Sequence, residues 1–212
     1  MATYDLEEQE QLAELKAWWK QYGNLVFMLI LAALLVLAAW NGWRWYQRSQ
    51  TAEAGTYYDT LQKAARANDL KAVRDATGTI LEKYSDTAYA PLAALVSGKV
   101  HFQSGDLKTA RAQLQWAVEH ARHEEVRWIA RLRLASASLD DGAFDDALKV
   151  LEPAPPKGFE SLVPAMRGDI YAALKKPAEA AVAYRIALEK AGTTDAALRE
   201  SIKFKLDALG GV

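Results

Sequence analysis

The residues best suited to chemistry are two histidines near the middle of the chain. His120 and His123 stand one helical turn apart, and Glu119 and Glu124 flank them. Imidazole and carboxylate groups at this spacing can bind a divalent metal. The chain has only one more histidine, His101, and an arginine stands inside the cluster. We therefore interpret the cluster as a solvated helix end rather than a metal site.

Other side chains that could support catalysis lack the partners that catalysis needs. Ser136 and Ser138 have no histidine at a spacing that suggests a nucleophile and its base, and no glycine-rich phosphate loop occurs. The chain has no cysteine, which excludes disulfides, thiolate catalysis and cysteine-based zinc sites. We expect no catalytic residue, no metal site and no cofactor. The remaining candidate is a surface for protein partners, and its position depends on the helices that carry it.

The stretch that organises the chain is the apolar run 25–40, LVFMLILAALLVLAAW. The 23 residues between Lys20 and Arg44 carry no formal charge, and as a helix they would extend ~34 Å, enough for a bilayer core of ~30 Å. Aromatic residues, which settle at membrane interfaces, flank the run: Trp18, Trp19 and Tyr22 before it, and Trp40, Trp43, Trp45 and Tyr46 after it. The pattern predicts one transmembrane helix over residues 21–46, in contact with membrane lipid.

The sequence before this helix argues against a cleaved signal peptide. Signal peptides begin with basic residues and have a shorter apolar core, whereas residues 1–20 hold five carboxylates against two lysines. We expect an acidic N-terminal tail over residues 1–20. It could form a short helix from about Asp5 or remain a solvated, partly disordered segment.

The rest of the chain, residues 47–212, has helical periodicity throughout and no alternating strand pattern. Its formal charge is close to zero, so it lacks the basic surface of a nucleic-acid-binding domain. Four positions recur with the same separations of 37 and 33 residues. These columns are Gly98, Ala135 and Gly168; Ala110, Ala147 and Ala180; Leu114, Leu151 and Tyr184; and Ala117, Ala154 and Ala187. An ordinary helical bundle would not keep such a register across three hairpins.

The columns indicate helix hairpins whose two helices cross closely, with a small residue of the first helix facing an alanine of the second. Gly105 and Gly142 fall at the turns between the helices, where a left-handed residue can end a helix. A more degenerate hairpin, 52–67 and 70–84, precedes the three units, and a capping helix over 194–209 follows them. The prolines of residues 152–158 must end one second helix near Leu151. The fold class is therefore all-α: a single transmembrane helix followed by a tetratricopeptide-repeat-like α-solenoid.

The partner surface then follows from the register of the repeats. In such arrays the first helices line the concave side, and residues one, four and five places after the small column share a face. The candidate partner-binding residues selected in this way are Lys99, Phe102, Gln103, Ser136, Asp140, Asp169 and Ala173. Leu139 and Ala172 satisfy the same rule, but packing against neighbouring helices explains them equally well.

The whole chain resembles the YfgM family in its acidic N-terminus, in its single membrane helix ending in Trp43-Arg44-Trp45-Tyr46 and in its repeat domain. The segments 129–135, IARLRLA, and 166–169, MRGD, are local matches in first helices. The resemblance implies an ancillary subunit of the SecYEG translocon that cooperates with a membrane-anchored periplasmic chaperone of the PpiD type and with emerging polypeptide clients. It also implies a single-pass protein of the bacterial inner membrane with a cytoplasmic N-terminus and a periplasmic C-terminal domain.

Charge alone does not orient the membrane helix. Lys16 and Lys20 precede it, and Arg44, Arg48 and Lys63 follow it within about twenty residues, a difference too small to decide. Two further functions stay open from the residues. One is a self-associating envelope scaffold or adaptor, and the other is a membrane-bound hydrolase or metalloenzyme, which the lack of a catalytic constellation disfavours.

Overall fold

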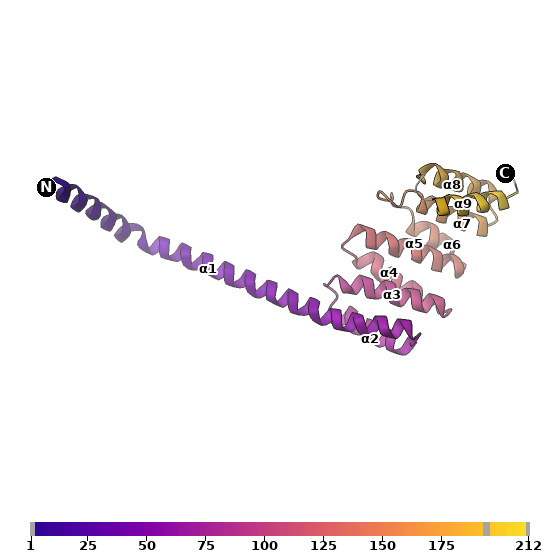
Figure 1. Ribbon diagram of the computed structural model, residues 1–212, viewed down its shortest axis with the longest axis horizontal. Coiled ribbons are helices and arrows are strands. Elements are labelled where there is room, and N and C mark those ends of the chain that lie inside the picture. Colours follow the sequence, from indigo (N-terminus) through magenta and orange to yellow (C-terminus); the bar gives the residue numbers. More distant parts are fainter. Residues whose placement is uncertain (1–2, 193–195, 211–212) are drawn as a thin grey trace. The chain divides into compact units, whose positions relative to one another are not determined.

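A computed structural model of the chain describes residues 3–192 and 196–210, and the regular structure of these residues is entirely helical (Figure 1). The chain divides into two compact units, residues 1–49 and 50–212. The first helix, α1 (Thr3–Arg66), contributes to both units. The helices that follow it in the described part of the chain are α2 (Leu70–Lys83), α3 (Tyr89–Gln103), α4 (Leu107–His120), α5 (Glu124–Asp140), α6 (Phe144–Val150), α7 (Leu162–Ala173), α8 (Pro177–Lys190) and α9 (Ala196–Ala208).

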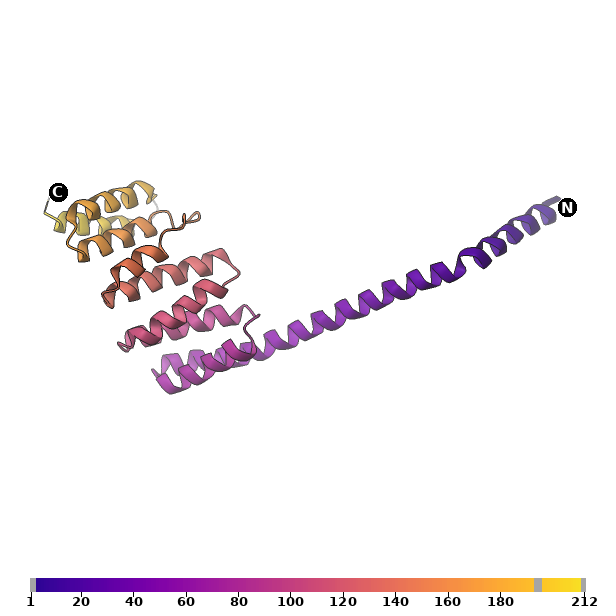
Figure 2. The same ribbon diagram turned by 180° about the vertical axis from the view of Figure 1, so that it is seen from behind.

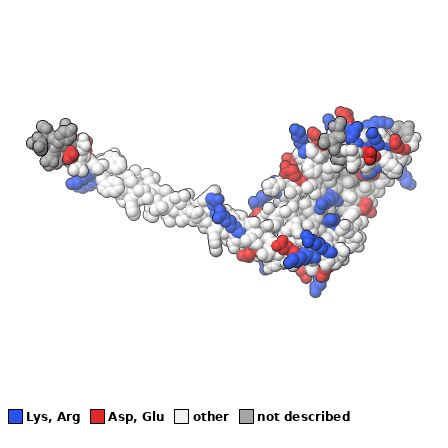
Figure 3. Space-filling view, viewed as in Figure 1, with Lys and Arg blue, Asp and Glu red and all other residues white. Residues whose placement is uncertain are grey.

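The described residues of the first unit form one continuous stretch of α1. Within the described residues, α1 is the one helix long and apolar enough to cross a membrane, and its apolar side chains are exposed rather than packed in a core. Figure 3 shows no charged side chain along this apolar stretch. Exposed leucines and a phenylalanine at this density are stable in lipid, not in water. The single membrane helix expected from the sequence is therefore present.

The helix begins before the apolar run, at Thr3. Of the two alternatives for the N-terminal tail, the structure has the helix. The segment contains no proline, its first glycine is Gly23, and it is rich in glutamate, glutamine, leucine, alanine and lysine. These residues have high helix propensity, so the helix can continue outward from the apolar run.

The second unit is a stack of helix hairpins. The C-terminal part of α1 forms the first hairpin with α2, and α3/α4, α5/α6 and α7/α8 form the next three. Figures 1 and 2, seen from opposite sides, show these layers one after another. Four clusters of buried apolar side chains follow one another along the stack. The degenerate first hairpin, the three repeats and the final capping helix expected from the sequence are all formed.

The turns inside the hairpins use left-handed residues. Gly105 and Gly142 have φ angles of +82° and +73° at the α3–α4 and α5–α6 turns, which glycine adopts without steric cost. Asn68 and Lys175 take the same position in the other two hairpins, with φ of +52° and +57°. Asp106 then begins α4, because its Oδ1 accepts a hydrogen bond from the Thr109 N–H at 3.1 Å.

The small-residue column lies where the two helices of a hairpin cross. A Cβ atom on Gly98 would stand 2.7 Å from Cγ of Leu114, and one on Gly168 would stand 2.4 Å from Cε1 of Tyr184. Leu114 and Tyr184 belong to the third repeating column, at the position that Leu151 takes in the middle hairpin. The shared spacing of the columns therefore reflects a shared packing contact.

The second helix of the middle hairpin is short. α6 has 7 residues, whereas α4 and α8 have 14 each. Proline residues beginning at Pro153 prevent its continuation, and Ala154 lies exposed outside any helix, as expected. Arg131 donates a hydrogen bond to the Val150 carbonyl at 2.8 Å, and Arg167 donates one to the Leu151 carbonyl at 2.8 Å. These arginines satisfy carbonyl groups that a continuing helix would have used.

The last helix, α9, covers the apolar end of the array. Ile202 is buried in the final cluster with Tyr184 and Ala187. Arg199 donates hydrogen bonds to the carbonyls of Leu188 at 3.0 Å and Ala191 at 2.8 Å. The capping helix is thus attached both by apolar packing and by hydrogen bonds to the C-terminal end of α8.

Candidate partner-binding groove

A groove of about 290 Å³ runs between the first helices of two successive repeats, α3 and α5. Its lining consists of Gly98, Lys99, Phe102, Gln103, Leu114, Arg133 and Ser136. Four of the residues predicted to bind a partner, Lys99, Phe102, Gln103 and Ser136, therefore share one hollow. They come together because α3 and α5 pack side by side as consecutive first helices.

The floor of the groove depends on the close crossing of α3 and α4. Gly98 has no side chain, so Leu114 reaches between the helices and forms the apolar base. Phe102 is half-buried and packs against the core cluster that contains Leu114. An apolar floor beside polar walls is typical of a site that receives an apolar side chain from a protein partner.

The walls of the groove are cationic. Among the described residues that line it, Lys99 and Arg133 are the only ionisable ones, and none is a carboxylate. Arg133 donates a hydrogen bond to the Leu95 carbonyl at 3.3 Å, which fixes its guanidinium along α3. Lys99 is exposed and makes no hydrogen bond or ion pair with the described part of the chain. The groove thus presents a positive potential above an apolar base.

The other three predicted residues lie outside this groove. Asp140 is exposed at the end of α5, and Ala173 is exposed at the end of α7. Asp169 accepts hydrogen bonds from the Tyr184 hydroxyl at 2.7 Å and from Lys205 Nζ at 2.8 Å. Its carboxylate therefore joins α7 to α8 and α9.

Burial and the hydrogen bond to Asp169 raise the pKa of Tyr184, so this tyrosine remains a neutral donor. Leu139 and Ala172, for which packing was an equal explanation, are partly buried against the third and fourth core clusters.

The search by repeat register missed Arg133 and Leu114. Arg133 lies three residues before Ser136, on the same face of α5, so extending the rule backward along the helix would have found it. Leu114 was recognised only as a repeat column. Leu114 is buried, and its place at the base of the groove follows from the missing side chain of Gly98. This placement has no signal of its own in the sequence.

His120, one of the two histidines considered as metal ligands, packs against the preceding turn of α4. The imidazole of His120 stacks on Trp116 with ring centroids 4.2 Å apart, and its Nδ1 lies 2.9 Å from the Trp116 carbonyl oxygen. Glu119 accepts a hydrogen bond from Gln115 at 2.6 Å. Among the described residues, no group of three or more histidine, aspartate or glutamate side chains is arranged to hold a metal ion.

Three named relatives match most of this chain, and the chain covers most of each of them. A protein of Haemophilus influenzae named ancillary SecYEG translocon subunit is 29% identical over 171 residues, covering 81% of this chain and 83% of the relative. A protein of Neisseria gonorrhoeae with the same name is 28% identical over 205 residues, covering 96% and 98%. One of Escherichia coli, also so named, is 23% identical over 169 residues, covering 80% and 81%.

A family model also matches most of the chain. Residues 16–211 match the model of the tetratricopeptide repeat-like domain. The match begins before the membrane helix and ends beyond α9, and the hairpins, turns and small-residue crossings described above lie within it. The chain therefore belongs to the tetratricopeptide repeat-like domain family.

Proposed function

We propose that this chain is a non-enzymatic, membrane-tethered protein-binding module that serves as an ancillary subunit of a SecYEG translocon. In this role it links the translocon to a membrane-anchored periplasmic chaperone of the PpiD type and to emerging polypeptides. The observation that carries the proposal is the groove between α3 and α5, which combines an apolar base with cationic walls and has no carboxylate among its lining residues. The translocon enters the proposal through the names of the relatives in three bacteria.

Each proposed role belongs to a separate segment of the chain. Residues 1–20 form the acidic tail, residues 21–46 the membrane helix and residues 47–212 the binding domain. The tail would lie in the cytoplasm, the helix would cross the inner membrane once and the domain would lie in the periplasm. Tethering raises the local concentration of the domain near its membrane partners, so weak contacts suffice for binding.

The proposed orientation can be tested with protease added to spheroplasts. A protease outside the inner membrane should degrade the C-terminal domain and leave an epitope on the N-terminal tail protected. Degradation of the tail with protection of the domain would place the domain on the cytoplasmic side and contradict the proposal.

The proposed binding face can be tested by photocrosslinking in intact cells. A photoreactive amino acid at Phe102 should give adducts with a translocon subunit, a periplasmic chaperone or a translocating chain. The matched control is the same amino acid at Arg74, which is exposed on α2 and outside the groove. Equal adducts from both positions, or no such adduct from Phe102, would contradict the proposal.

Self-association as an envelope scaffold is the second candidate, and one observation favours it. Val182 and Ile186 on α8 are exposed by 54% and 43% and line an apolar hollow with Tyr171 and Pro164. Sedimentation of the full chain in detergent distinguishes the two functions. A stable oligomer that Val182→Glu dissociates would support the scaffold, and a monomer would support the adaptor.

A further inference from the structure

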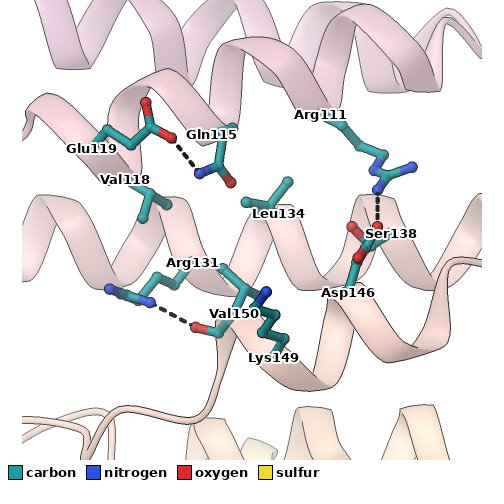
Figure 4. Close-up of a pocket in the computed structure, with 10 residues that line it drawn as sticks. All are labelled: Arg111, Gln115, Val118, Glu119, Arg131, Leu134, Ser138, Asp146, Lys149 and Val150. Atoms are coloured by element: carbon teal, nitrogen blue, oxygen red, sulfur yellow. Dashed lines mark hydrogen bonds and ion pairs between the residues drawn. The ribbon is translucent and has the colours of Figure 1, made fainter.

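The shortness of α6 leaves a second hollow on the other side of α5. This hollow has a volume of about 570 Å³ and lies between α4 and α6 above α5 (Figure 4). On α5 it is lined by Arg131, Leu134 and Ser138, whereas the groove described above uses Arg133 and Ser136. Residues two apart on a helix point to opposite sides, so the two hollows are separate surfaces.

The length of the hollow is comparable with that of the missing part of α6. If α6 had the length of α4, its next seven residues would extend ~10 Å further along this face. The lining of α4 runs from Arg111 to Glu119, a distance of ~12 Å along the helix axis. The space is therefore suited to about two turns of a helix.

The two ends of the hollow differ. At one end Arg111 forms ion pairs with Asp141 and, at 2.7 Å, with Asp146, which joins α4 to the hairpin of α5 and α6. At the other end α6 has stopped, and Val118 and Glu119 of α4 face Arg131 across an open space (Figure 4). An incoming segment must therefore enter at the open end.

The chemistry of the open end is apolar at the base and cationic at the α6 side. Val118 and Leu134 are exposed by only 8% and 5% and form the base with Val150. Lys149 makes no side-chain hydrogen bond or ion pair with the described residues. One nitrogen of Arg131 donates a hydrogen bond to the Val150 carbonyl, and the guanidinium carbon lies 5.5 Å from the centre of the Trp128 ring.

Among the described residues, no carboxylate within salt-bridge distance balances these two cations. Burial lowers the pKa of Arg131, and the like charge of Arg127 contributes to the same shift. Glu119, the other acid of the lining besides Asp146, is on the opposite wall and accepts a hydrogen bond from Gln115. A carboxylate supplied from outside would thus meet two positive groups that have no internal counter-charge.

We propose that this hollow binds a short amphipathic helix of a partner protein, which takes the place of the missing turns of α6. The helix places apolar side chains on Val118 and Leu134 and directs aspartate or glutamate toward Lys149 and Arg131. This surface is distinct from the α3–α5 groove and does not depend on the translocon role. It would let the chain hold two protein segments at once, one on each side of α5.

The test uses the full chain in phosphatidylcholine nanodiscs and two fluorescent peptides. Both peptides are stapled helices of roughly four turns, with leucines at i, i+4 spacing on one face. The helix face next to the leucines carries glutamates in one peptide and lysines in the other. Fluorescence anisotropy measures binding, with empty nanodiscs as the blank. The glutamate peptide should bind the chain about fivefold or more tightly than the lysine peptide.

Substitutions of two exposed lysines test whether the glutamate peptide binds in the hollow. Lys149→Glu should abolish or reverse the preference for the glutamate peptide, because Lys149 is exposed and has no internal partner whose loss could unfold the site. Lys157→Glu, the same charge change on the exposed loop outside the hollow, should leave the preference unchanged. Equal binding of the two peptides, absence of saturable binding, or equal effects of the two substitutions would overturn the proposal.

Discussion

At the level of single residues, the α3–α4 and α7–α8 crossings leave no room for a Cβ atom at Gly98 and Gly168. Gly168→Ala would place a Cβ atom 2.4 Å from a ring carbon of Tyr184. That ring is 2% exposed and its hydroxyl donates to Asp169, so it cannot move without losing the hydrogen bond. We expect the substitution to lower the free energy of unfolding by about 1–3 kcal/mol, measured by chemical denaturation of the full chain in detergent.

The control for this prediction is the same change at a helical glycine with free space around it. A Cβ atom on Gly78 of α2 would meet no atom within 4 Å, so Gly78→Ala should stabilise the protein by up to about 1 kcal/mol through helix propensity. If both substitutions changed stability by the same amount, the crossing would not lie at Gly168 and the repeat register would be wrong.

A second residue-level prediction concerns the start of α4. Hydrogen bonds from Thr109 lower the pKa of Asp106, and the neighbouring His101 adds to the shift. A lowered pKa means that the ionised carboxylate stabilises the folded state above its ordinary pKa, and that this contribution is lost as the pH falls through the lower folded value. Asp106→Asn keeps a side chain that can cap the helix but removes the charge.

The wild-type chain should therefore melt at a higher temperature than Asp106→Asn at about pH 6, and the difference should shrink below about pH 4. Circular dichroism melts at the two pH values measure it. A difference that stayed constant or widened in acid would show that the carboxylate charge does not stabilise the fold.

At the level of elements, the attachment of α9 depends on Arg199. Arg199→Met keeps most of the side-chain volume but removes the hydrogen bonds to the Leu188 and Ala191 carbonyls. We expect the substitution to lower the free energy of unfolding by about 1–2 kcal/mol. It should also accelerate hydrogen exchange more in α9 than in α3. Mass spectrometry of deuterium uptake measures the local effect.

The matched control is Arg74→Met, at an exposed arginine of α2 whose side chain makes no hydrogen bond or ion pair within the described residues. It should leave exchange in α9 unchanged. Uniform acceleration across α3 and α9 in Arg199→Met would mean that the capping helix unfolds only together with the whole domain.

At the level of the whole molecule, membrane attachment depends on the apolar part of α1. Replacing both Leu31 and Leu34 by arginine introduces two charges into the centre of this stretch, at a cost of about 2.5–3.5 kcal/mol each. The chain should then pass from the carbonate-resistant membrane fraction to the soluble fraction. Leu12→Arg, before the uncharged run, should not cause this shift. Retention of the double variant in the membrane would contradict a single spanning helix.

Much of the architecture could be predicted because it depends on local chemistry. The uncharged run between Lys20 and Arg44 determines a membrane helix by length and hydropathy alone. Gly105 and Gly142 mark turns because few other residues adopt a left-handed backbone easily. The prolines after Leu151 end α6 because they remove backbone donors. The repeat columns predicted that Gly98 and Gly168 lie at helix crossings, but the side chains nearest to these glycines are Leu114 and Tyr184 rather than the alanines of the second column.

The surfaces were decided by tertiary packing. The repeat register selected Lys99, Ser136 and Asp169 by the same rule, yet Asp169 joins α7 to Tyr184 and Lys205, while the other two line a groove. A helical register determines the direction of a side chain but not which residue of a distant helix stands opposite. The sequence by itself thus determined the helices, their ends and their crossings. Only the stacked hairpins decided where cations lack a counter-charge and where the shortened α6 leaves a hollow, because both features depend on contacts between segments far apart in the chain.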